Sequence, residues 1–261
     1  MKKLLISMAV TASFAGSSLA ADLPVKAPPS VPAPVASWTG CFVGGGGGYG
    51  MFDQRHNTVS PTGAPILTGV VDLDTGGKGW FGTVEVGCDY QVADRWVIGV
   101  MGDYDFHGMK GRFSPAGVAG AGGLGIVGEE KQRDSWAVGG RLGYAVIPRL
   151  LAYVSGGYTE ARVDGVSFVN VLGATASTLT MDAQNYKGWF LGSGYEYGLD
   201  LIPGLFWKTE YRYSSYRAED PAIRLANGTV ADLEHKHMYE QTIRSELVYR
   251  FNFFGGGSAR Y

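Results

Sequence analysis

Alternation of apolar and polar side chains is the strongest pattern in this chain, and it is clearest over residues 80–106. One face of residues 80–90 is apolar and has an aromatic residue at each end, Trp80 and Tyr90. After a short polar break the alternation resumes, and Trp96 and Phe106 end the apolar face of residues 96–106. Period-two alternation on both sides of a short turn predicts an antiparallel β-hairpin.

The spacing of these aromatic residues predicts that the hairpin crosses a membrane. A strand from Trp80 to Tyr90 is roughly 33 Å long, and a tilt of about 40–45° reduces its height to about 25 Å. That is the height of a lipid-facing band with an aromatic girdle at each edge. Trp80 and Phe106 would mark the outer girdle, and Tyr90 and Trp96 the periplasmic one.

The same alternation recurs along the chain and predicts eight strands, at residues 38–52, 80–90, 96–106, 132–146, 150–163, 186–199, 205–214 and 239–253. The pattern does not settle which way the strand at 150–163 faces. Long connections at 53–79, 107–131, 164–185 and 215–238 alternate with short turns. Long loops at one end and tight turns at the other predict an all-β fold, an eight-stranded antiparallel up-and-down transmembrane β-barrel. Both termini would then be periplasmic and the long loops extracellular.

Composition supports this fold and excludes some functions. The 261 residues include 41 Gly and 15 Tyr, which suits a sheet that alternates small residues with interfacial aromatics. Only 4 His and 2 Cys are present, which leaves little material for a metal site. The net charge of −2 does not favour nucleic acid as a partner.

The first residues have the pattern of a secretory signal peptide, which we assign to residues 1–21. Lys2 and Lys3 precede an apolar run at 4–15, and residues 18–20 form a small-x-small cleavage site. No other apolar run reaches the ~18 residues of a helical membrane span. Residues 22–37 contain five prolines and predict a periplasmic spacer, followed by the barrel at 38–261. The predicted location is the outer membrane of a Gram-negative cell.

Several short motifs, in their order and spacing, resemble a known family. They are AADLPVKAPP at residues 20–29, SWTGCFVGGGGGYG at 37–50, KTEYRY at 208–213 and SELVYRF at 245–251. Together they are similar to small outer-membrane β-barrel surface antigens of alphaproteobacteria, known as outer membrane immunogenic or porin-family proteins. The resemblance covers nearly the whole chain and implies an eight-stranded barrel related to OmpA-type domains and opacity-type antigens. Cys41 and Phe42 depart from the aromatic pattern of that family.

Charged residues at inward positions predict an ionic network in the lumen. An eight-stranded interior is just wide enough to be filled by side chains, and a buried charge needs a partner. We therefore expect a structural plug, and a narrow water-filled pore is the alternative. The predicted network comprises Glu85, Asp103, Asp105, Arg133, Arg141, Glu196, Lys208, Glu210, Arg212, Arg244 and Glu246.

Other candidate chemistry is weaker. Asp103 and Asp105 have the spacing of a carboxylate pair, but no nucleophile or substrate pocket is implied, and we predict no enzyme. Some relatives of the resembling family are described as haemin-binding, and the resemblance makes His235, His237 and Tyr239 candidate ligands. A solvated loop is the alternative for these three residues. No cofactor and no metal site is predicted.

Cys41 and Cys88 are expected near the periplasmic ends of adjacent strands. The periplasm is oxidising, so they form either a cross-strand disulfide or two free thiols, depending on the register. The expected partners are the outer-membrane bilayer and, during biogenesis, periplasmic chaperones and the barrel-assembly machinery. The expected function is structural and surface-exposed, in envelope integrity and as a surface antigen or adhesion protein. A small porin and haemin capture are the alternatives. The role of the tail after Phe251 is left open.

Overall fold

The computed structural model describes residues 37–59, 73–113, 126–170 and 176–251, and their regular structure is entirely β. No helix among these residues is long and apolar enough to cross a membrane. The predicted signal peptide, most of the proline-rich spacer and the tail after Phe251 lie outside the described residues. Those predictions therefore concern the sequence alone.

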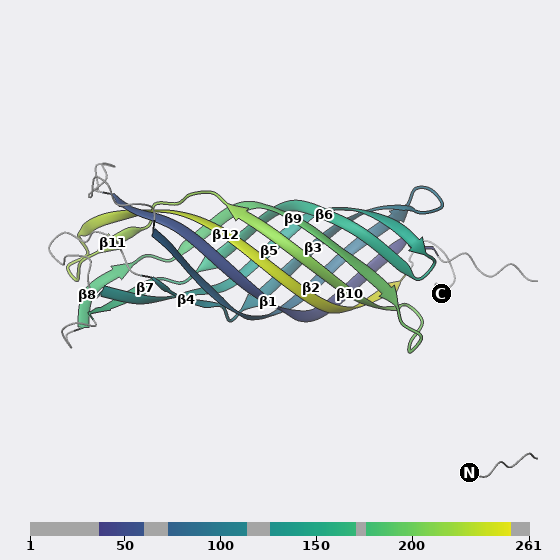
Figure 1. Ribbon diagram of the computed structural model, residues 1–261, viewed down its shortest axis with the longest axis horizontal. Helices are drawn as coiled ribbons and strands as arrows, with labels where there is room; N and C mark the ends of the chain where they lie inside the picture. Colours follow the sequence, from purple (N-terminus) through teal and green to yellow (C-terminus); the bar gives the residue numbers. More distant parts are fainter. Residues whose placement is uncertain (1–36, 60–72, 114–125, 171–175, 252–261) are drawn as a thin grey trace, which may run out of the picture. The chain divides into compact units, whose positions relative to one another are not determined.

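Eight long strands form a closed ring, in which each strand pairs antiparallel with the next and the last pairs with the first (Figure 1). They are β1 (Gly40–Val59), β2 (Leu73–Gln91), β3 (Trp96–His107), β5 (Ile126–Ile147), β6 (Leu150–Val163), β9 (Gln184–Gly198), β10 (Leu205–Tyr216) and β12 (Val230–Phe251). Closure leaves no free edge in the ring, which a bilayer requires because it offers no hydrogen-bond partners. The predicted eight-stranded up-and-down barrel is confirmed.

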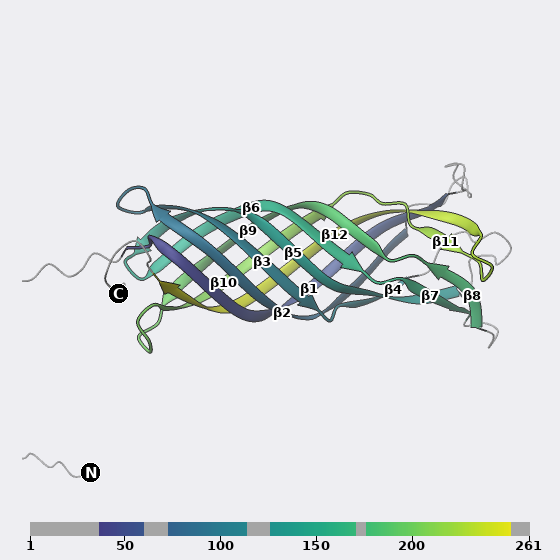
Figure 2. The same cartoon turned by 180° about the vertical axis from the view of Figure 1, so that it is seen from behind.

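The two ends of the barrel differ in their connections (Figure 2). At one end, here called the turn end, short turns join β2 to β3, β5 to β6 and β9 to β10, and β1 begins beside the end of β12. Gly204 in the β9–β10 turn has φ +86°, in the left-handed region that favours glycine. The opposite end is here called the loop end.

The loop end contains more strand than the sequence predicts. The short strands there are β4 (Lys110–Phe113), β7 (Val166–Asn170), β8 (Ala176–Met181) and β11 (Ala222–Arg224). In addition, β1 continues to Val59, β2 begins at Leu73, β5 at Ile126 and β12 at Val230, all inside predicted loops. The prediction of four plain loops was therefore wrong. Three of the short strands, β7, β8 and β11, bury an apolar cluster of their own, which comprises Val166, Phe168, Leu179, Met181 and Ile223.

The outward surface carries aromatic side chains in two groups. Near the loop end, Tyr49 packs on Trp80 with ring centroids 5.1 Å apart, and Trp189 packs on Tyr213 at 5.9 Å. Near the turn end, Trp96 packs on Tyr144 at 5.2 Å and other pairs continue the group. Exposed aliphatic residues lie between the two groups. This is the surface of a barrel that crosses a bilayer between two interfaces.

The structure settles the faces of β6 and changes one of β5. Leu151, Tyr153 and Ser155 of β6 point inward, which the pattern left undecided. Arg133 of β5 was predicted inward, but its side chain is 62% exposed. The β5–β6 register shifts between Gln132 and Asp134, so the inward positions are even-numbered before the shift and odd-numbered after it. The inward prediction for Arg133 was wrong for this reason.

Inward glycines leave room for large side chains from neighbouring strands. A Cβ on Gly99 would lie 2.0 Å from Oδ1 of Asp89, and one on Gly192 would lie 2.4 Å from Oγ of Ser155. The same holds for Gly87, where a Cβ would lie 2.3 Å from Cζ of Phe42. The high glycine content therefore serves the packing of the lumen.

Candidate functional site: the charged barrel interior

The inward positions of the ring bury an unusual number of ionisable side chains. Strand alternation directs them there, because every second residue of each strand must face the lumen. Buried charges are costly unless they are paired, so their arrangement decides whether the interior is a plug or a channel. The charges on the membrane-crossing part of the barrel lie in two groups, one at the turn end and one at its centre.

The first group is a closed ring of four residues, here called the turn-end ring: Asp89, Arg141, Glu196 and Arg250. Arg141 donates from Nε to Oδ1 of Asp89 at 2.8 Å and from Nη1 to Oε1 of Glu196 at 2.5 Å. Arg250 donates to Oδ2 of Asp89 at 2.7 Å and to Oε2 of Glu196 at 2.6 Å. Each arginine bridges both carboxylates, so the charges of the ring balance while all four side chains are buried.

An apolar cluster closes the barrel around this ring and is here called the turn-end seal. Phe42 and Phe206 are 1% and 0% exposed, and Trp38 is 1% exposed. The guanidinium of Arg141 lies 4.3 Å from the ring centroid of Phe42, and that of Arg250 lies 4.9 Å from that of Trp38. The complete seal comprises Trp38, Phe42, Val97, Met101, Ala145, Leu151, Phe206 and Val248.

The second group, here called the central layer, has one half organised by Lys208. Nζ of Lys208 contacts the carboxylate of Glu85 and lies 3.5 Å from Oε1 of Glu246. It also lies 3.9 Å from Oε2 of Glu210, which accepts a hydrogen bond of 2.9 Å from the hydroxyl of Tyr153. One fully buried ammonium group thus holds three carboxylates that come from three strands.

Two arginines organise the other half of the central layer. Arg212 binds Asp103 through two parallel contacts of 2.9 Å and donates from Nε to Oε1 of Glu210 at 2.9 Å. Arg244 donates to Asp105 at 2.9 Å and to Asp103 at 3.3 Å. Such bidentate contacts hold both partners in one orientation. The layer contains three cations and five carboxylates, so it is net acidic.

A third set of polar contacts fills the lumen toward the loop end. His56 Nδ1 lies 2.5 Å from Oε1 of Glu234, and Lys236 Nζ donates to Oε1 of Glu130 at 3.1 Å. Burial lowers the pKa of Lys236, and the nearby carboxylate of Glu130 opposes that effect. Apolar and aromatic residues pack among these groups; they are Phe52, Met109, Ala161, Val163, Tyr186, Tyr216 and Met238.

The predicted network and the structure agree on most inward residues. All of the predicted residues except Arg133 are buried in the lumen, and each of those has a charged partner within 4.0 Å. The predicted set omits Asp89 and Arg250, although both lie at inward positions of the alternating pattern. It also omits the pairs near the loop end, such as His56 with Glu234, because those segments were interpreted as loops.

The haemin candidates lie on the outward face of β12, not in the lumen. His235 is exposed, and its Nδ1 lies 2.6 Å from Oδ1 of Asp220. The ring of His237 packs on Tyr239 with centroids 4.5 Å apart. Among the described residues, no group of three or more His, Cys, Asp or Glu side chains is arranged to hold a metal ion.

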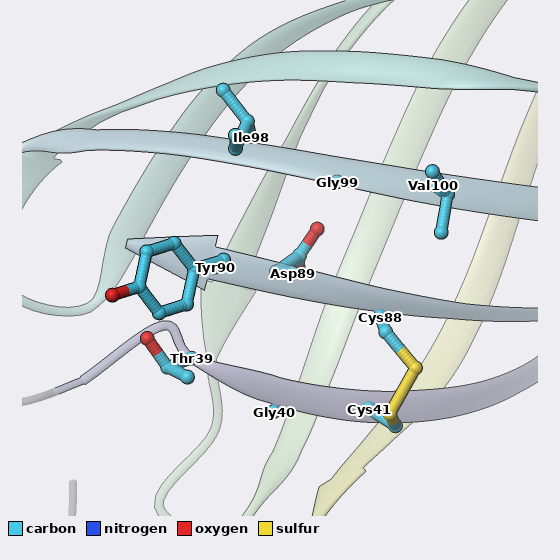
Figure 3. Close-up of a pocket in the computed structure, with 9 residues that line it drawn as sticks. All are labelled: Thr39, Gly40, Cys41, Cys88, Asp89, Tyr90, Ile98, Gly99 and Val100. Carbon is cyan, nitrogen blue, oxygen red and sulfur yellow. A yellow bond between two sulfur atoms is a disulfide. The ribbon is translucent and has the colours of Figure 1, made fainter. Parts of the chain in front are cut away.

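Cys41 and Cys88 lie opposite each other in the β1–β2 register and are joined by a disulfide. Figure 3 shows this bond across the two strands, on the outward side of the barrel. It borders an outward groove of about 390 Å³, whose other walls include Tyr90, Ile98 and Val100. The bond ties the start of β1 to the strand that supplies Asp89 to the turn-end ring.

Comparison with known proteins agrees with this architecture. The outer membrane protein beta-barrel domain matches residues 9–251. The chain belongs to this family. The 31 kDa outer-membrane immunogenic protein of Brucella melitensis is 31% identical over 261 residues, covering 95% of this chain and all of that protein. The 25 kDa outer-membrane immunogenic protein of Brucella canis is 28% identical, covering 96% of this chain and 99% of that protein. The resemblance drawn from the sequence motifs is confirmed.

Solved structures with a similar arrangement are more distant. OprG, an outer membrane protein from Pseudomonas aeruginosa, aligns with 82% of this chain and 97% of its own, at 12% identity and a TM-score of 0.48. Ail, the attachment invasion locus protein of Yersinia pestis, aligns with 82% of this chain and 99% of its own, at 14% identity and a TM-score of 0.38.

Proposed function

We propose that this outer-membrane protein is a structural, surface-exposed barrel with a sealed interior, which contributes to envelope integrity and presents an antigen or adhesion surface. The observation that carries the proposal is the filling of the lumen in series. A solute entering from the turn end meets the turn-end seal, then the turn-end ring, then the central layer. Each consists of buried side chains held by neighbours on several strands.

The proposal includes an orientation. The turn end and both ends of the barrel chain face the periplasm, and the loop end faces the exterior. Strand topology supports this, because outer-membrane barrels have short periplasmic turns and longer external connections. Periplasmic chaperones and the barrel-assembly machinery would then deliver and insert the chain. We assign no catalytic role to Asp103 and Asp105, because Arg212 and Arg244 occupy their carboxylates.

Planar-bilayer recording of the refolded protein tests the seal. The wild-type protein is expected to give no discrete conductance steps. A variant with Arg212→Ser and Arg244→Ser removes two cations of the central layer, but it should also stay silent because the turn-end seal remains. Adding Phe42→Ala and Phe206→Ala to that variant weakens the turn-end seal as well, and steps are expected once Arg141→Ser and Arg250→Ser also remove the two cations of the turn-end ring. Reproducible channels from the wild-type protein would refute the sealed interior and favour the small porin. The central layer, with five carboxylates and three cations, would make such a porin cation-selective.

Haemin capture is a second candidate, because His235, His237 and Tyr239 occupy successive outward positions of β12. This places two imidazoles and a phenol on one face near the loop end. Haemin titration of the refolded protein, followed by the Soret band, tests it. Binding that is absent, or that is unchanged in His235→Ala and His237→Ala, would remove this candidate.

A further inference from the structure

An outward groove near the loop end combines cations with aromatic walls and is here called the basic groove. Lys187, Arg217 and His237 line it together with Tyr158 and Trp189, and its volume is about 480 Å³. Gly157 and Gly188 also line the groove, through their backbone atoms. The side chains come from β6, β9, β12 and the residue that follows β10. Backbone pairing fixes their relative positions, since the Arg217 amide donates to the Lys187 carbonyl at 2.8 Å.

The protein neutralises the charge of the basic groove only in part. No carboxylate lines it, and neither Lys187 nor Arg217 forms an ion pair with any residue that the structure describes. Glu160 lies opposite Lys187 in the β6–β9 register, and its carboxylate borders the groove, where it accepts a hydrogen bond from the Tyr158 hydroxyl at 3.3 Å. The pKa of His237 is lowered, first by partial burial and then by the nearby side chains of His235 and Arg55. Two cations, Lys187 and Arg217, thus lie beside one bordering carboxylate, and the groove keeps a net positive charge.

The position of the groove relative to the aromatic group indicates its environment. Lys187 lies two residues beyond Trp189 along β9, which is roughly 7 Å along a strand. Trp189 packs on Tyr213, and Tyr213 packs on Tyr239 with centroids 6.3 Å apart. Interfacial aromatics mark the level where acyl chains meet headgroups, so cations just beyond them face the headgroup phosphates.

We propose that the basic groove binds a phosphate of a phosphorylated glycolipid in the outer leaflet, with Lys187 and Arg217 as its ligands. Both side chains are suited to phosphate, Arg217 through a planar fork of donors and Lys187 as a point charge. Trp189 and Tyr158 form the apolar wall beside the lipid. The inference rests on the proposed orientation, in which the loop end faces the exterior. Binding in detergent micelles is independent of the conductance test, so the two proposals fail separately.

A second outward groove near the loop end supplies a matched control. It has a volume of about 670 Å³ and contains Lys78, Lys110 and Arg112, but also Asp53 and Glu129. Lys110 Nζ lies 2.8 Å from Oε1 of Glu129, and this hydrogen bond holds the pKa of Glu129 below its usual value. Lys78 lies two residues beyond Trp80, as Lys187 lies beyond Trp189. The two grooves thus share cations and position but differ in their carboxylates.

The test measures the affinity of the full-length folded barrel for bis-phosphorylated lipid A by native mass spectrometry in detergent micelles. The double variant Lys187→Ala with Arg217→Ala should bind at least about tenfold more weakly, because two charge-assisted contacts are lost. The control, Lys78→Ala with Arg112→Ala, removes the same charge and should change the affinity less than about threefold. Enzymatically dephosphorylated lipid A should bind the wild-type protein as weakly as the groove variant binds the phosphorylated lipid.

Three results would overturn the proposal: equal losses in both double variants, no loss in the groove variant, or undiminished binding of the dephosphorylated lipid. Equal losses would indicate general attraction to a cationic rim. The heat-dependent shift of each variant in SDS gels verifies folding. A milder pair, Lys187→Gln with Arg217→Gln, keeps the test available if the alanine variant does not fold.

Discussion

Replacing Arg250 by methionine tests whether the turn-end ring depends on charge balance. The guanidinium contacts Asp89 at 2.7 Å and Glu196 at 2.6 Å, and Arg250 is only 4% exposed. Methionine fills part of the space of the arginine stem but leaves Arg141 to neutralise two buried carboxylates. Removing one partner of a buried ion pair typically lowers stability by about 3–5 kcal/mol, because the remaining buried charge has no counter-charge. We expect Arg250→Met to lower the free energy of unfolding by that amount.

A second variant separates charge balance from lost contacts. Arg250→Met combined with Asp89→Asn leaves Arg141 paired with Glu196, so the ring is smaller but neutral. This double variant should cost only about 1–2 kcal/mol, the value of the missing hydrogen bonds, and should be more stable than the single variant. Arg95, an exposed arginine in the β2–β3 turn whose side chain makes one long hydrogen bond of 3.4 Å to the Tyr144 hydroxyl, provides the control, and Arg95→Met should change stability by less than about 0.5 kcal/mol.

The assay is urea-induced unfolding of protein refolded into lipid vesicles, followed by tryptophan fluorescence. Unfolding and refolding curves should superimpose before free energies are compared. The reasoning is refuted if Arg250→Met costs less than about 1 kcal/mol, or if the double variant is no more stable than the single one. Either result would mean that water or relaxation of the backbone screens the carboxylates in the ring.

Three further outcomes are expected in the same assay. Gly99→Ala should lower the free energy of unfolding by about 1–3 kcal/mol, because the new Cβ would lie 2.0 Å from Oδ1 of Asp89. Gly102→Ala is the control and should be nearly neutral, since the nearest atom to its Cβ would be 3.5 Å away. Similar costs for the two variants would contradict the packing argument. Cys88→Ser opens a covalent loop with a sequence separation of 47 and should cost up to about 4 kcal/mol, with no further loss on adding reductant. Lys236 has a pKa below 10.5 in the folded state, so the unfolded chain binds more protons and stability should rise with pH from the folded pKa toward 10.5. That rise should be absent in Lys236→Met, and a fall in the wild-type protein would reverse the assigned direction.

The barrel could be predicted from the sequence because each strand shows its two faces within its own short segment. Each membrane-crossing strand faces lipid on one side and the lumen on the other, so alternation is directly visible in residues such as Trp207, Lys208 and Glu210. Short turns also limit the possible pairings. The inward charges followed from the same rule, and only their partners required the structure. Partners such as Arg212 and Asp103 are 109 residues apart and on opposite sides of the ring.

The predictions for Arg133 and for the loop end were wrong because the alternation of apolar and polar residues is interrupted or weak there. One bulge in β5 reverses the parity of the strand and moves Arg133 outside, and no local residue signals that bulge. Near the loop end the strands contain glycine, charges and few apolar residues, and they pair with segments far away in the chain. Their apolar positions, such as Phe168 and Ile223, form a core only after β7, β8 and β11 are brought together. A pattern read along one segment does not reveal such a cluster.

The inward glycines also affect how the sequence can drift among relatives. The side chain of Asp89 occupies the space beside Gly99, and that of Ser155 occupies the space beside Gly192. A larger side chain at one position of such a pair therefore requires a smaller one at the other. Substitutions in the lumen should therefore occur as compensated pairs between strands. In an alignment of relatives, the size of the residue at position 99 should vary inversely with that at position 89, and the sum of the two volumes should vary less than either one. The barrel would then keep a constant filling of its interior while individual positions change.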